Sequence, residues 1–284
     1  MRKLALNRLD AFFAGIAERE TLYLPVDTPA GAKFEPWERG KTLSDALNTV
    51  RSAKDFFFPQ TENLMDFKTE GKKIEIIDTR RECEDFVIFG VRACDVRSFD
   101  VLDKVFLSEP ADSYYKNRRE HGVIVSLACT KPLETCFCGT FGIDAASPAG
   151  DVTAWKTEDA LYLAANTEKG RALLKLVEDL TEDADEAPVA EQQKVTRARM
   201  KKLPLANLTA EKFGAGKTDE FFGDPVWAEL SQSCLGCGTC TFVCPTCQCY
   251  DIKDFNTGHG VRRFRCWDSC MYSEFTKMSA GQPR

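Results

Sequence analysis

Residues 234–245 read CLGCGTCTFVCP, and this stretch decides how the last part of the chain must fold. Its cysteines follow the spacing C-x2-C-x2-C-x3-C-P, a pattern that binds iron–sulfur clusters. A cubane cluster needs thiolates that converge from one tight loop, and Gly236 and Gly238 permit the positive φ angles of such a loop. Pro245 then stops the loop and redirects the chain. The sequence therefore predicts a 4Fe-4S site with the ligands Cys234, Cys237, Cys240 and Cys244.

Zinc is the alternative metal for closely spaced cysteines. Zinc ribbons pair one C-x2-C with a second such pair after a longer gap, whereas here all four cysteines fall within one short run. The spacing therefore favours iron–sulfur over zinc. In ferredoxin-type runs the fourth cysteine usually binds a different cluster from the first three. The cluster that Cys244 binds would therefore need further ligands from elsewhere in the chain. Four more cysteines follow in the sequence: Cys247, Cys249, Cys266 and Cys270.

These eight cysteines supply enough thiolates for two cubane clusters, so we expect at least one 4Fe-4S cluster and favour two or more. The spacing does not say which thiolate binds which cluster. Some of the last four could instead be free cysteines in the core, because free cysteine is often buried. We expect at least two of the four to be ligands.

A second group of cysteines lies in the first half of the chain. Cys94 follows the apolar run FVIFGV, and Cys129 follows the apolar run GVIVSL. Ligand sites in α/β sheets collect outside the carboxyl ends of the strands, so we expect a metal or redox site there. The alternative is a set of unrelated thiols. The four cysteines of this group are Cys94, Cys129, Cys136 and Cys138.

Charged residues accompany both groups of cysteines. Arg92 and Asp95 flank Cys94, where they either tune the site or form an ordinary ion pair. A run of arginines near the end of the chain could stabilise the reduced, more negative state of a nearby cluster, although such runs are also common on surfaces. Cys83 has no partner pattern, and we expect it to be structural. The arginines are Arg262, Arg263 and Arg265.

The first part of the chain predicts a sheet with helices packed on it. The two apolar runs suit strands that are buried on both faces, and each is followed by polar loop residues and then by helical periodicity. This alternation predicts an α/β fold (or α+β) with a partly parallel sheet. The expected strands are residues 21–26, 73–77, 86–91, 122–127 and 161–165, and the expected helices include residues 5–16 and 98–106.

Three regions are expected along the chain. Residues 1–167 form an N-terminal α/β domain with the possible cysteine site, residues 168–229 a helical connector and loop, and residues 230–284 a ferredoxin-like iron–sulfur domain. No complete P-loop is present, and no strand leads into a G-x-G-x-x-G turn. We therefore expect that this chain alone binds no flavin or nucleotide.

Composition excludes several classes of function. The net charge of −6 argues against a nucleic-acid binder, and no apolar stretch is long enough to predict a membrane span. The N-terminus lacks the pattern of a secretion signal, so we expect a reducing, cytoplasmic location. There, closely spaced cysteines more often bind metal than form disulfides. The chain has 13 cysteines and only two histidines, which leaves little material for mixed zinc sites.

Five motifs resemble a family of iron–sulfur subunits that includes the sulfhydrogenase beta subunit and the corresponding iron–sulfur subunit of anaerobic sulfite reductase. They are FFFPQTENLM (56–65), FGVRACDVRSFDVLDKVF (89–106), CFCGTFG (136–142), CLGCGTCTFVCPTCQCYD (234–251) and RCWDSCMYSEFTKMSAG (265–281). The motifs are spread over most of the chain, and the two C-terminal ones are the more specific. Family members continue into a second C-x2-C-x2-C-x3-C-P run, which this sequence does not contain before Arg284. The ligands that join Cys244 therefore stay open.

The resemblance implies an electron-transfer subunit of a cytoplasmic anaerobic complex, without catalytic residues of its own. Its partners would be a flavin subunit that handles NAD(P)H and a catalytic redox subunit. One alternative makes the N-terminal cysteine site catalytic, for example in reducing a disulfide or a flavin. An open pocket beside Cys94 and Cys136 would favour that alternative, whereas a sealed site would favour a relay. A second alternative is a structural metal module that does not change its redox state.

Overall fold

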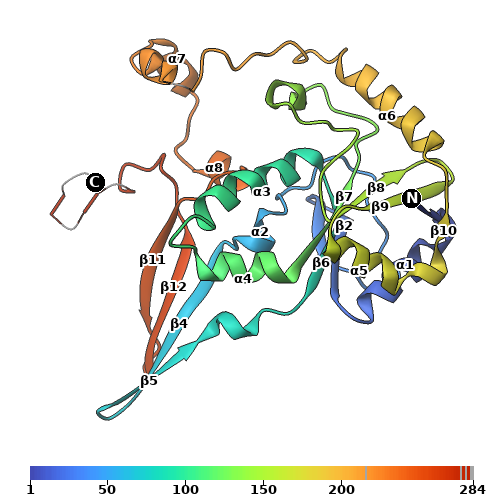
Figure 1. The fold of residues 1–284 in the computed structure, drawn as a ribbon. Coiled ribbons are helices and arrows are strands. Elements are labelled where there is room, and N and C mark those ends of the chain that lie inside the picture. Colours follow the sequence, from blue (N-terminus) through green and yellow to red (C-terminus); the bar gives the residue numbers. More distant parts are fainter. Residues whose placement is uncertain (215, 276, 279, 282–284) are drawn as a thin grey trace.

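Two β-sheets organise the chain in the computed structural model, which describes residues 1–214, 216–275, 277–278 and 280–281 (Figure 1). The larger sheet has eight strands in the order β10-β1-β9-β8-β7-β6-β2-β3. The smaller sheet has four strands in the order β11-β12-β4-β5. Within the described residues, no helix is both long and apolar enough to cross a membrane.

The centre of the larger sheet is parallel, as the sequence predicts. Strands β6 (Phe86–Val91) and β7 (Gly122–Leu127) are buried along their whole length, and both match the expected bounds. They pair in parallel with each other, with β2 (Thr21–Thr28) on one side and with β8 (Val152–Lys156) on the other. The predicted α/β class with a partly parallel sheet is therefore confirmed.

Antiparallel strands complete the larger sheet at its two edges. β9 (Ala160–Ala165) pairs with β8 and with β1 (Arg2–Ala5), and β1 pairs with β10 (Glu182–Asp183). At the other edge β3 (Gly31–Pro36) pairs with β2.

Helices cover both faces of this sheet because successive side chains of a strand point to opposite faces. On one face Val87 and Phe89 pack with Phe12, Phe13 and other residues of one core. On that face lie α1 (Leu9–Ala17) and α5 (Glu168–Leu176). The second core, on the other face, is formed with α2 (Lys54–Phe57), α3 (Ala93–Phe106) and α4 (Ser113–His121).

Two predicted helices have different bounds from those expected. The first helix was expected over residues 5–16, but Ala5 ends β1 and the short η1 (Leu6–Arg8) precedes α1. That prediction was wrong at its start because β1 forms backbone hydrogen bonds with β9, a pairing that local periodicity does not reveal. The second helix, α3, begins at Ala93, five residues before the expected start at residue 98.

The connector packs against the first region. It contains α5, η4 (Glu178–Leu180), β10 and α6 (Ala187–Met200), then η5 (Lys217–Phe221) and α7 (Val226–Ser231). From α6, Thr196 Oγ1 donates a hydrogen bond to the carbonyl of Cys129 at 3.0 Å, and Arg199 donates to the carbonyl of Thr130 at 2.6 Å. Helix α6 thus holds the loop that follows β7.

The smaller sheet joins two distant parts of the sequence. β4 (Thr61–Glu70) and β5 (Lys73–Asp78) come from the first part, and β11 (Tyr250–Asn256) and β12 (Gly260–Trp267) from the last. β12 pairs antiparallel with β4. The smaller sheet therefore combines strands from both sides of the boundaries expected at residues 167 and 229.

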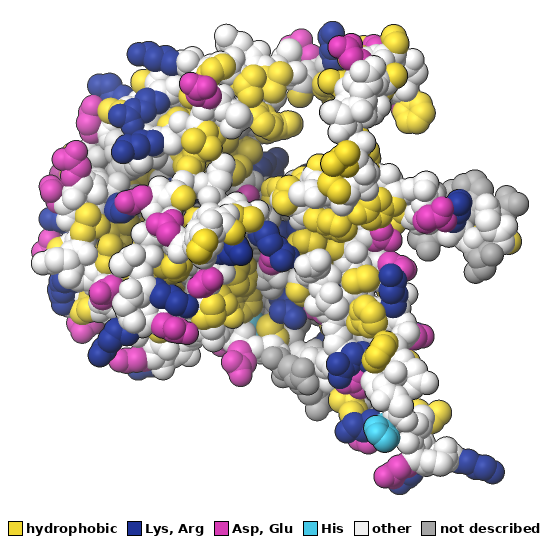
Figure 2. All heavy atoms as spheres, turned by 180° about the vertical axis from the view of Figure 1, so that it is seen from behind, with side chains coloured by type: hydrophobic (Ala, Val, Ile, Leu, Met, Phe, Trp, Pro, Cys, Tyr) yellow, Lys and Arg dark blue, Asp and Glu magenta, His cyan; other side chains and the backbone are white. Residues whose placement is uncertain are grey.

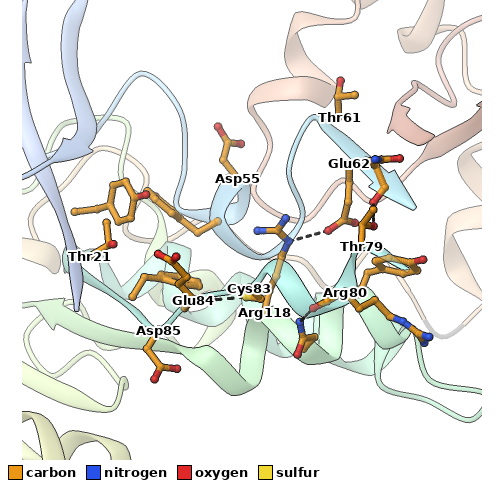
Figure 3. Close-up of a pocket in the computed structure, with 16 residues that line it drawn as sticks. Thr21, Asp55, Thr61, Glu62, Thr79, Arg80, Cys83, Glu84, Asp85 and Arg118 are labelled. Carbon is orange, nitrogen blue, oxygen red and sulfur yellow. Dashed lines mark hydrogen bonds and ion pairs between the residues drawn. The ribbon is translucent and has the colours of Figure 1, made fainter. Parts of the chain in front are cut away.

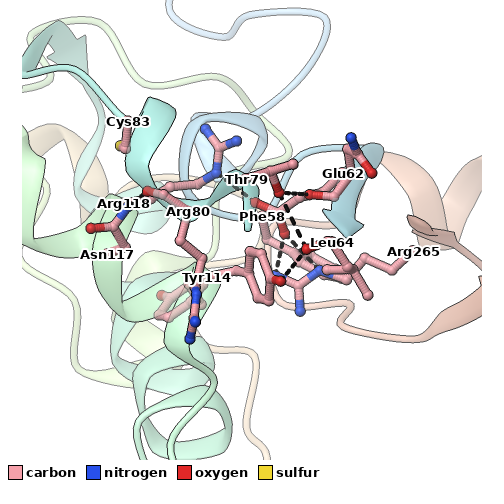
Figure 4. Close-up of polar contacts among 12 residues, drawn as sticks. Phe58, Glu62, Leu64, Thr79, Arg80, Cys83, Tyr114, Asn117, Arg118 and Arg265 are labelled. Carbon is pink, nitrogen blue, oxygen red and sulfur yellow. Dashed lines mark hydrogen bonds and ion pairs between the residues drawn. The ribbon is translucent and has the colours of Figure 1, made fainter. Parts of the chain in front are cut away.

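A buried group of charges fastens β12 to the first region (Figure 4). Arg265 Nε donates to Glu62 Oε2 at 2.7 Å, and Arg118 Nε donates to Glu62 Oε1 at 2.7 Å. Arg265 also pairs with Asp112, whose carboxylate caps the start of α4. The guanidinium lies 5.1 Å from the centroid of the Phe58 ring. Of the three arginines singled out in the sequence, Arg265 is thus a buried structural residue.

Candidate metal centres

The loop at residues 234–247, here called the ferredoxin loop, has the backbone that the sequence predicts. Gly236 and Gly238 have φ angles of +64° and +70°, and α8 (Thr239–Val243) follows. The backbone N–H of Gly236 points at Cys234 Sγ, 3.4 Å away. A Cβ at Gly238 would lie 2.3 Å from the hydroxyl oxygen of Tyr272, so a side chain there would displace the Tyr272 ring.

The first three cysteines of this loop are exposed thiols: Cys234, Cys237 and Cys240. Thr239 Oγ1 lies 3.3 Å from Cys237 Sγ, and hydrogen bonds from the side chain and backbone of Thr239 lower the pKa of the Cys237 thiol. Since the thiolate is the metal ligand, this environment favours the form that binds iron.

The fourth cysteine belongs to a different set of contacts, here called the Cys244 group. Hydrogen bonds from Thr246 and Cys247 lower the pKa of Cys244 although partial burial acts against them. Burial and the neighbouring Cys244 raise the pKa of Cys247 to about 11. Burial also raises the pKa of Cys249, whose thiol hydrogen-bonds with Cys270 and also lies near Cys247. The group therefore consists of Cys244, Cys247, Cys249 and Cys270.

Cys266 is placed differently from these four. It lies within β12 between Arg265 and Trp267, which are both buried. Because side chains alternate along a strand, Cys266 points to the opposite face of the sheet from these two residues. Its register partners are Thr61 in β4 and Asp251 in β11.

The four cysteines of the first half lie together beyond the carboxyl ends of β6 and β7, and we call them the Cys94 group. The Cys94 and Cys138 thiols form a hydrogen bond, which lowers the pKa of Cys138 and raises that of Cys94. Cys129 lies near Cys94 and Cys136, and mainly burial raises its pKa to about 11. β6 and β7 pair in parallel, so their carboxyl ends lie side by side and bring together the cysteines that follow them.

Arg92 and Asp95 both lie beside the Cys94 group. The Arg92 guanidinium donates to the backbone carbonyls of Leu47 and Ala128 at 3.0 and 3.2 Å. Its charge also interacts with the Cys129 and Cys94 thiols. Burial raises the pKa of Asp95 to about 6, although a backbone hydrogen bond and the charge of Arg92 act the other way. Arg92 thus ties together the loops that surround these cysteines.

Among the described residues, no group of three or more cysteine, histidine, aspartate or glutamate side chains lies close enough together to hold a metal ion. The thiols instead form hydrogen-bonded pairs: Cys94 with Cys138, Cys244 with Cys247, and Cys249 with Cys270. Thiolate ligands and glycine-rich loops with N–H groups directed at sulfur fit iron–sulfur clusters. The donor chemistry therefore fits, and the assignment of each cysteine to a cluster stays a prediction.

A cavity connects the two halves of the molecule. It has a volume of about 480 Å³ and is lined by Cys94, Cys136 and Cys138 on one side and by Val243 and Pro245 of the ferredoxin loop on the other. Most of its remaining wall is apolar, with aromatic side chains from Phe34, Phe137 and Phe141. The Cys94 group is therefore open to a pocket, and the residues that flank Cys244 face the same space.

A second cavity, of about 410 Å³, lies next to the buried charges of β4 (Figure 3). Cys83 lines it together with Arg118 and Glu62, and Arg118 bridges to Glu62. Burial raises the pKa of the Cys83 thiol, which keeps it protonated. Cys83 is the one cysteine in the described lining of this cavity.

Lys54 is a part of the site that the sequence did not reveal. Its side chain is buried, and its ammonium group donates to the backbone carbonyls of Cys244 at 2.9 Å and Cys247 at 3.2 Å. Mainly burial lowers the pKa of Lys54, whereas the nearby thiols act in the opposite direction. The only signal in the sequence is a lysine shortly before the motif at 56–65, and this signal is too weak to predict a contact with residues near 244.

Comparison with known proteins identifies relatives of both parts of the chain. Residues 233–284 match the model of a 4Fe-4S dicluster domain. Over 270 residues the chain is 32% identical to sulfhydrogenase 2 subunit beta of Pyrococcus furiosus, a similarity that covers 94% of this chain and 78% of the relative. No solved structure gives a significant match.

Proposed function

Because the chain belongs to the iron–sulfur subunit family that includes this sulfhydrogenase beta subunit, we propose that it relays electrons within a cytoplasmic anaerobic oxidoreductase complex. Electrons would pass between a flavin subunit that handles NAD(P)H and a catalytic redox subunit. One observation carries the proposal: the chain is 32% identical over 270 residues to a sulfhydrogenase beta subunit, and its last part matches a 4Fe-4S dicluster domain. The Cys94 group and the ferredoxin loop also line the same cavity, so that two candidate redox sites lie near each other. Two redox sites in one chain, close to each other, are what a relay needs.

Three sets of cysteines would hold the clusters. The exposed thiols Cys234, Cys237 and Cys240 serve one 4Fe-4S cluster, and the Cys244 group and the Cys94 group supply ligands for others. Bound clusters would provide one-electron redox chemistry, whose potential depends on hydrogen bonds and charge around the sulfurs. The chain's own residues hold the thiolates in place, through Thr239 at Cys237 and Arg92 at the loops of the Cys94 group.

Exposed apolar side chains beside the ferredoxin loop support a contact with partner subunits. Figure 2 shows hydrophobic side chains on the projecting segment that carries α7. Four of them leave much of their surface open to solvent: Phe222, Trp227, Leu230 and Leu235. Exposed apolar surface of this kind marks interaction sites, and here it lies next to the exposed cysteines.

A second candidate function has an observation in its favour. The cavity beside Cys94, Cys136 and Cys138 is open and large enough for a small molecule. A catalytic site at the Cys94 group, which would reduce a disulfide or a free flavin, would need such a pocket. A purely structural metal module has no comparable support from this cavity.

An assay of the isolated, cluster-loaded chain separates the relay from the reductase. For a relay, the chemically reduced chain is expected to give electrons to a one-electron dye but to show no turnover with NADH, NADPH, a small disulfide or free FMN. Addition of the partner subunits should restore electron flow from NAD(P)H. Turnover of disulfide or FMN by the isolated chain, abolished in Cys94→Ser and retained in Cys83→Ser, would contradict the relay and establish the reductase.

A further inference from the structure

Lys54 is buried beneath the ferredoxin loop. It begins α2, its side chain is 1% exposed, and its Nζ lies 3.8 Å from the centroid of the Trp267 ring. From this position Nζ donates hydrogen bonds to the carbonyl oxygens of Cys244 at 2.9 Å, Cys247 at 3.2 Å and Phe242 at 3.4 Å. One side chain thus holds the loop backbone at three places.

A buried ammonium group is costly unless negative charge or good hydrogen bonds compensate for its lost hydration. The hydrogen bonds of Lys54 go to carbonyls and its charge faces an indole ring, while the neighbouring Asp55 pairs with Arg51 at 2.7 Å. Asp55 also acts on the charge of Lys54, and the other anionic groups that would act on it are Cys247 and Cys244 in their thiolate forms. The location of this cation therefore makes sense if an anionic group forms at these two cysteines.

The helix that carries Lys54, α2, is anchored in the core, and this packing holds the ammonium group in place. Phe57 and Phe58, a few residues after Lys54, are fully buried in the second core. On the other side Trp267, which ends β12, donates its indole N–H to the carbonyl of Phe58 at 3.2 Å. Lysine, indole and loop thus form one packed unit that joins the first and last parts of the chain.

We propose that Lys54 is a positioning residue of the Cys244 group: it fixes the backbone between Phe242 and Cys247 and supplies positive charge beside a cluster bound there. Reduction adds one negative charge to a cluster, and a fixed nearby cation stabilises that more negative state. Lys54 therefore raises the reduction potential of the cluster that uses Cys244 or Cys247. The redox part of this inference rests on the proposed function, and the role in fixing the loop does not.

The test compares Lys54→Met with Lys54→Arg and with the control variant Lys169→Met. Methionine keeps the apolar stem but removes the charge and the hydrogen bonds, whereas arginine keeps a charge. Lys169 is a matched control because its Nζ also donates to two backbone carbonyls, at 2.7 and 3.1 Å, and burial also lowers its pKa. Its carbonyl partners belong to Arg119 and Gly122 rather than to the ferredoxin loop.

Two readouts are expected to change in Lys54→Met. In the full-length protein with clusters, redox titration followed by EPR should show one cluster with a lower midpoint potential. A tenfold shift in its ratio of oxidised to reduced form corresponds to about 59 mV for one electron. In the metal-free protein, the amides of residues 242–249 should exchange hydrogen faster than in the wild type. Lys54→Arg should recover the potential, and Lys169→Met should change neither readout.

Each result bears on one part of the inference. A wild-type potential in Lys54→Met would overturn the electrostatic role, and wild-type exchange in the metal-free variant would overturn the positioning role. If Lys54→Met loses its iron, recovery of iron in Lys54→Arg supports the role of the charge, and no recovery overturns it. A wild-type protein that binds no iron would refute the proposed function instead, and the exchange experiment would still decide whether Lys54 fixes the loop.

Discussion

Replacing Arg265 with methionine is expected to lower the free energy of unfolding by about 3–5 kcal/mol, the usual cost of removing one partner from a buried ion pair. The side chains of Arg265 and Glu62 are only 2% and 4% exposed, so the remaining carboxylate cannot regain its hydration. Arg118 still donates to Glu62 and should keep the loss at the lower end of this range. Chemical denaturation of the anaerobic, full-length protein, followed by circular dichroism, measures the change.

Arg263→Met is the matched control for this prediction. Arg263 lies two residues earlier on β12 and makes two hydrogen bonds of 2.8 Å to Asp254, but both partners are about half exposed. Exposed ion pairs contribute little, so the control should lose much less stability. Equal losses in the two variants would show that the buried charges do not fasten β12 to the first region.

Replacing Cys237 with serine is expected to remove one cluster, or about four iron atoms per chain. Cys237 is an exposed ligand candidate whose thiolate Thr239 stabilises, and serine cannot replace a soft sulfur donor. Few side chains of the ferredoxin loop are buried, so metal binding supplies much of its folding free energy. The variant should therefore also be cleaved faster by proteases between residues 230 and 249.

Cys83→Ser is the control, because Cys83 lines the other cavity and lies far along the chain from the ferredoxin loop. Its iron content and protease resistance should equal those of the wild type. If Cys237→Ser also keeps its full iron content and resistance, Cys237 is not a cluster ligand.

The strands that could be predicted are those with a local signal. β6 and β7 are continuous apolar runs buried on both faces, and both were placed with the right bounds. β4 and β12 were not predicted, because charged residues interrupt their apolar pattern. Their stability comes from pairing with each other and from contacts such as that between Glu62 and Arg265, which are 203 positions apart in sequence.

The candidate site, too, could be predicted from the sequence only in part. Cysteine spacing and the parallel order of β6 and β7 predicted which thiols could act as ligands and where the Cys94 group would lie. The contact between the thiols of Cys244 and Cys247 could not be derived from the cysteine spacing, because it depends on how the chain folds back after Pro245. Lys54 could not be derived either, since it reaches Cys244 across 190 positions of sequence.

Iron, acid-labile sulfide and zinc analysis of the anaerobically purified chain, combined with EPR of its reduced form, tests the central claim most directly. We expect brown protein that contains iron and sulfide in equal amounts, with the paramagnetic signal of reduced 4Fe-4S clusters. Stoichiometric zinc without iron or sulfide, and a reduced sample without an EPR signal, would contradict the assignment of this chain as an iron–sulfur electron-transfer subunit.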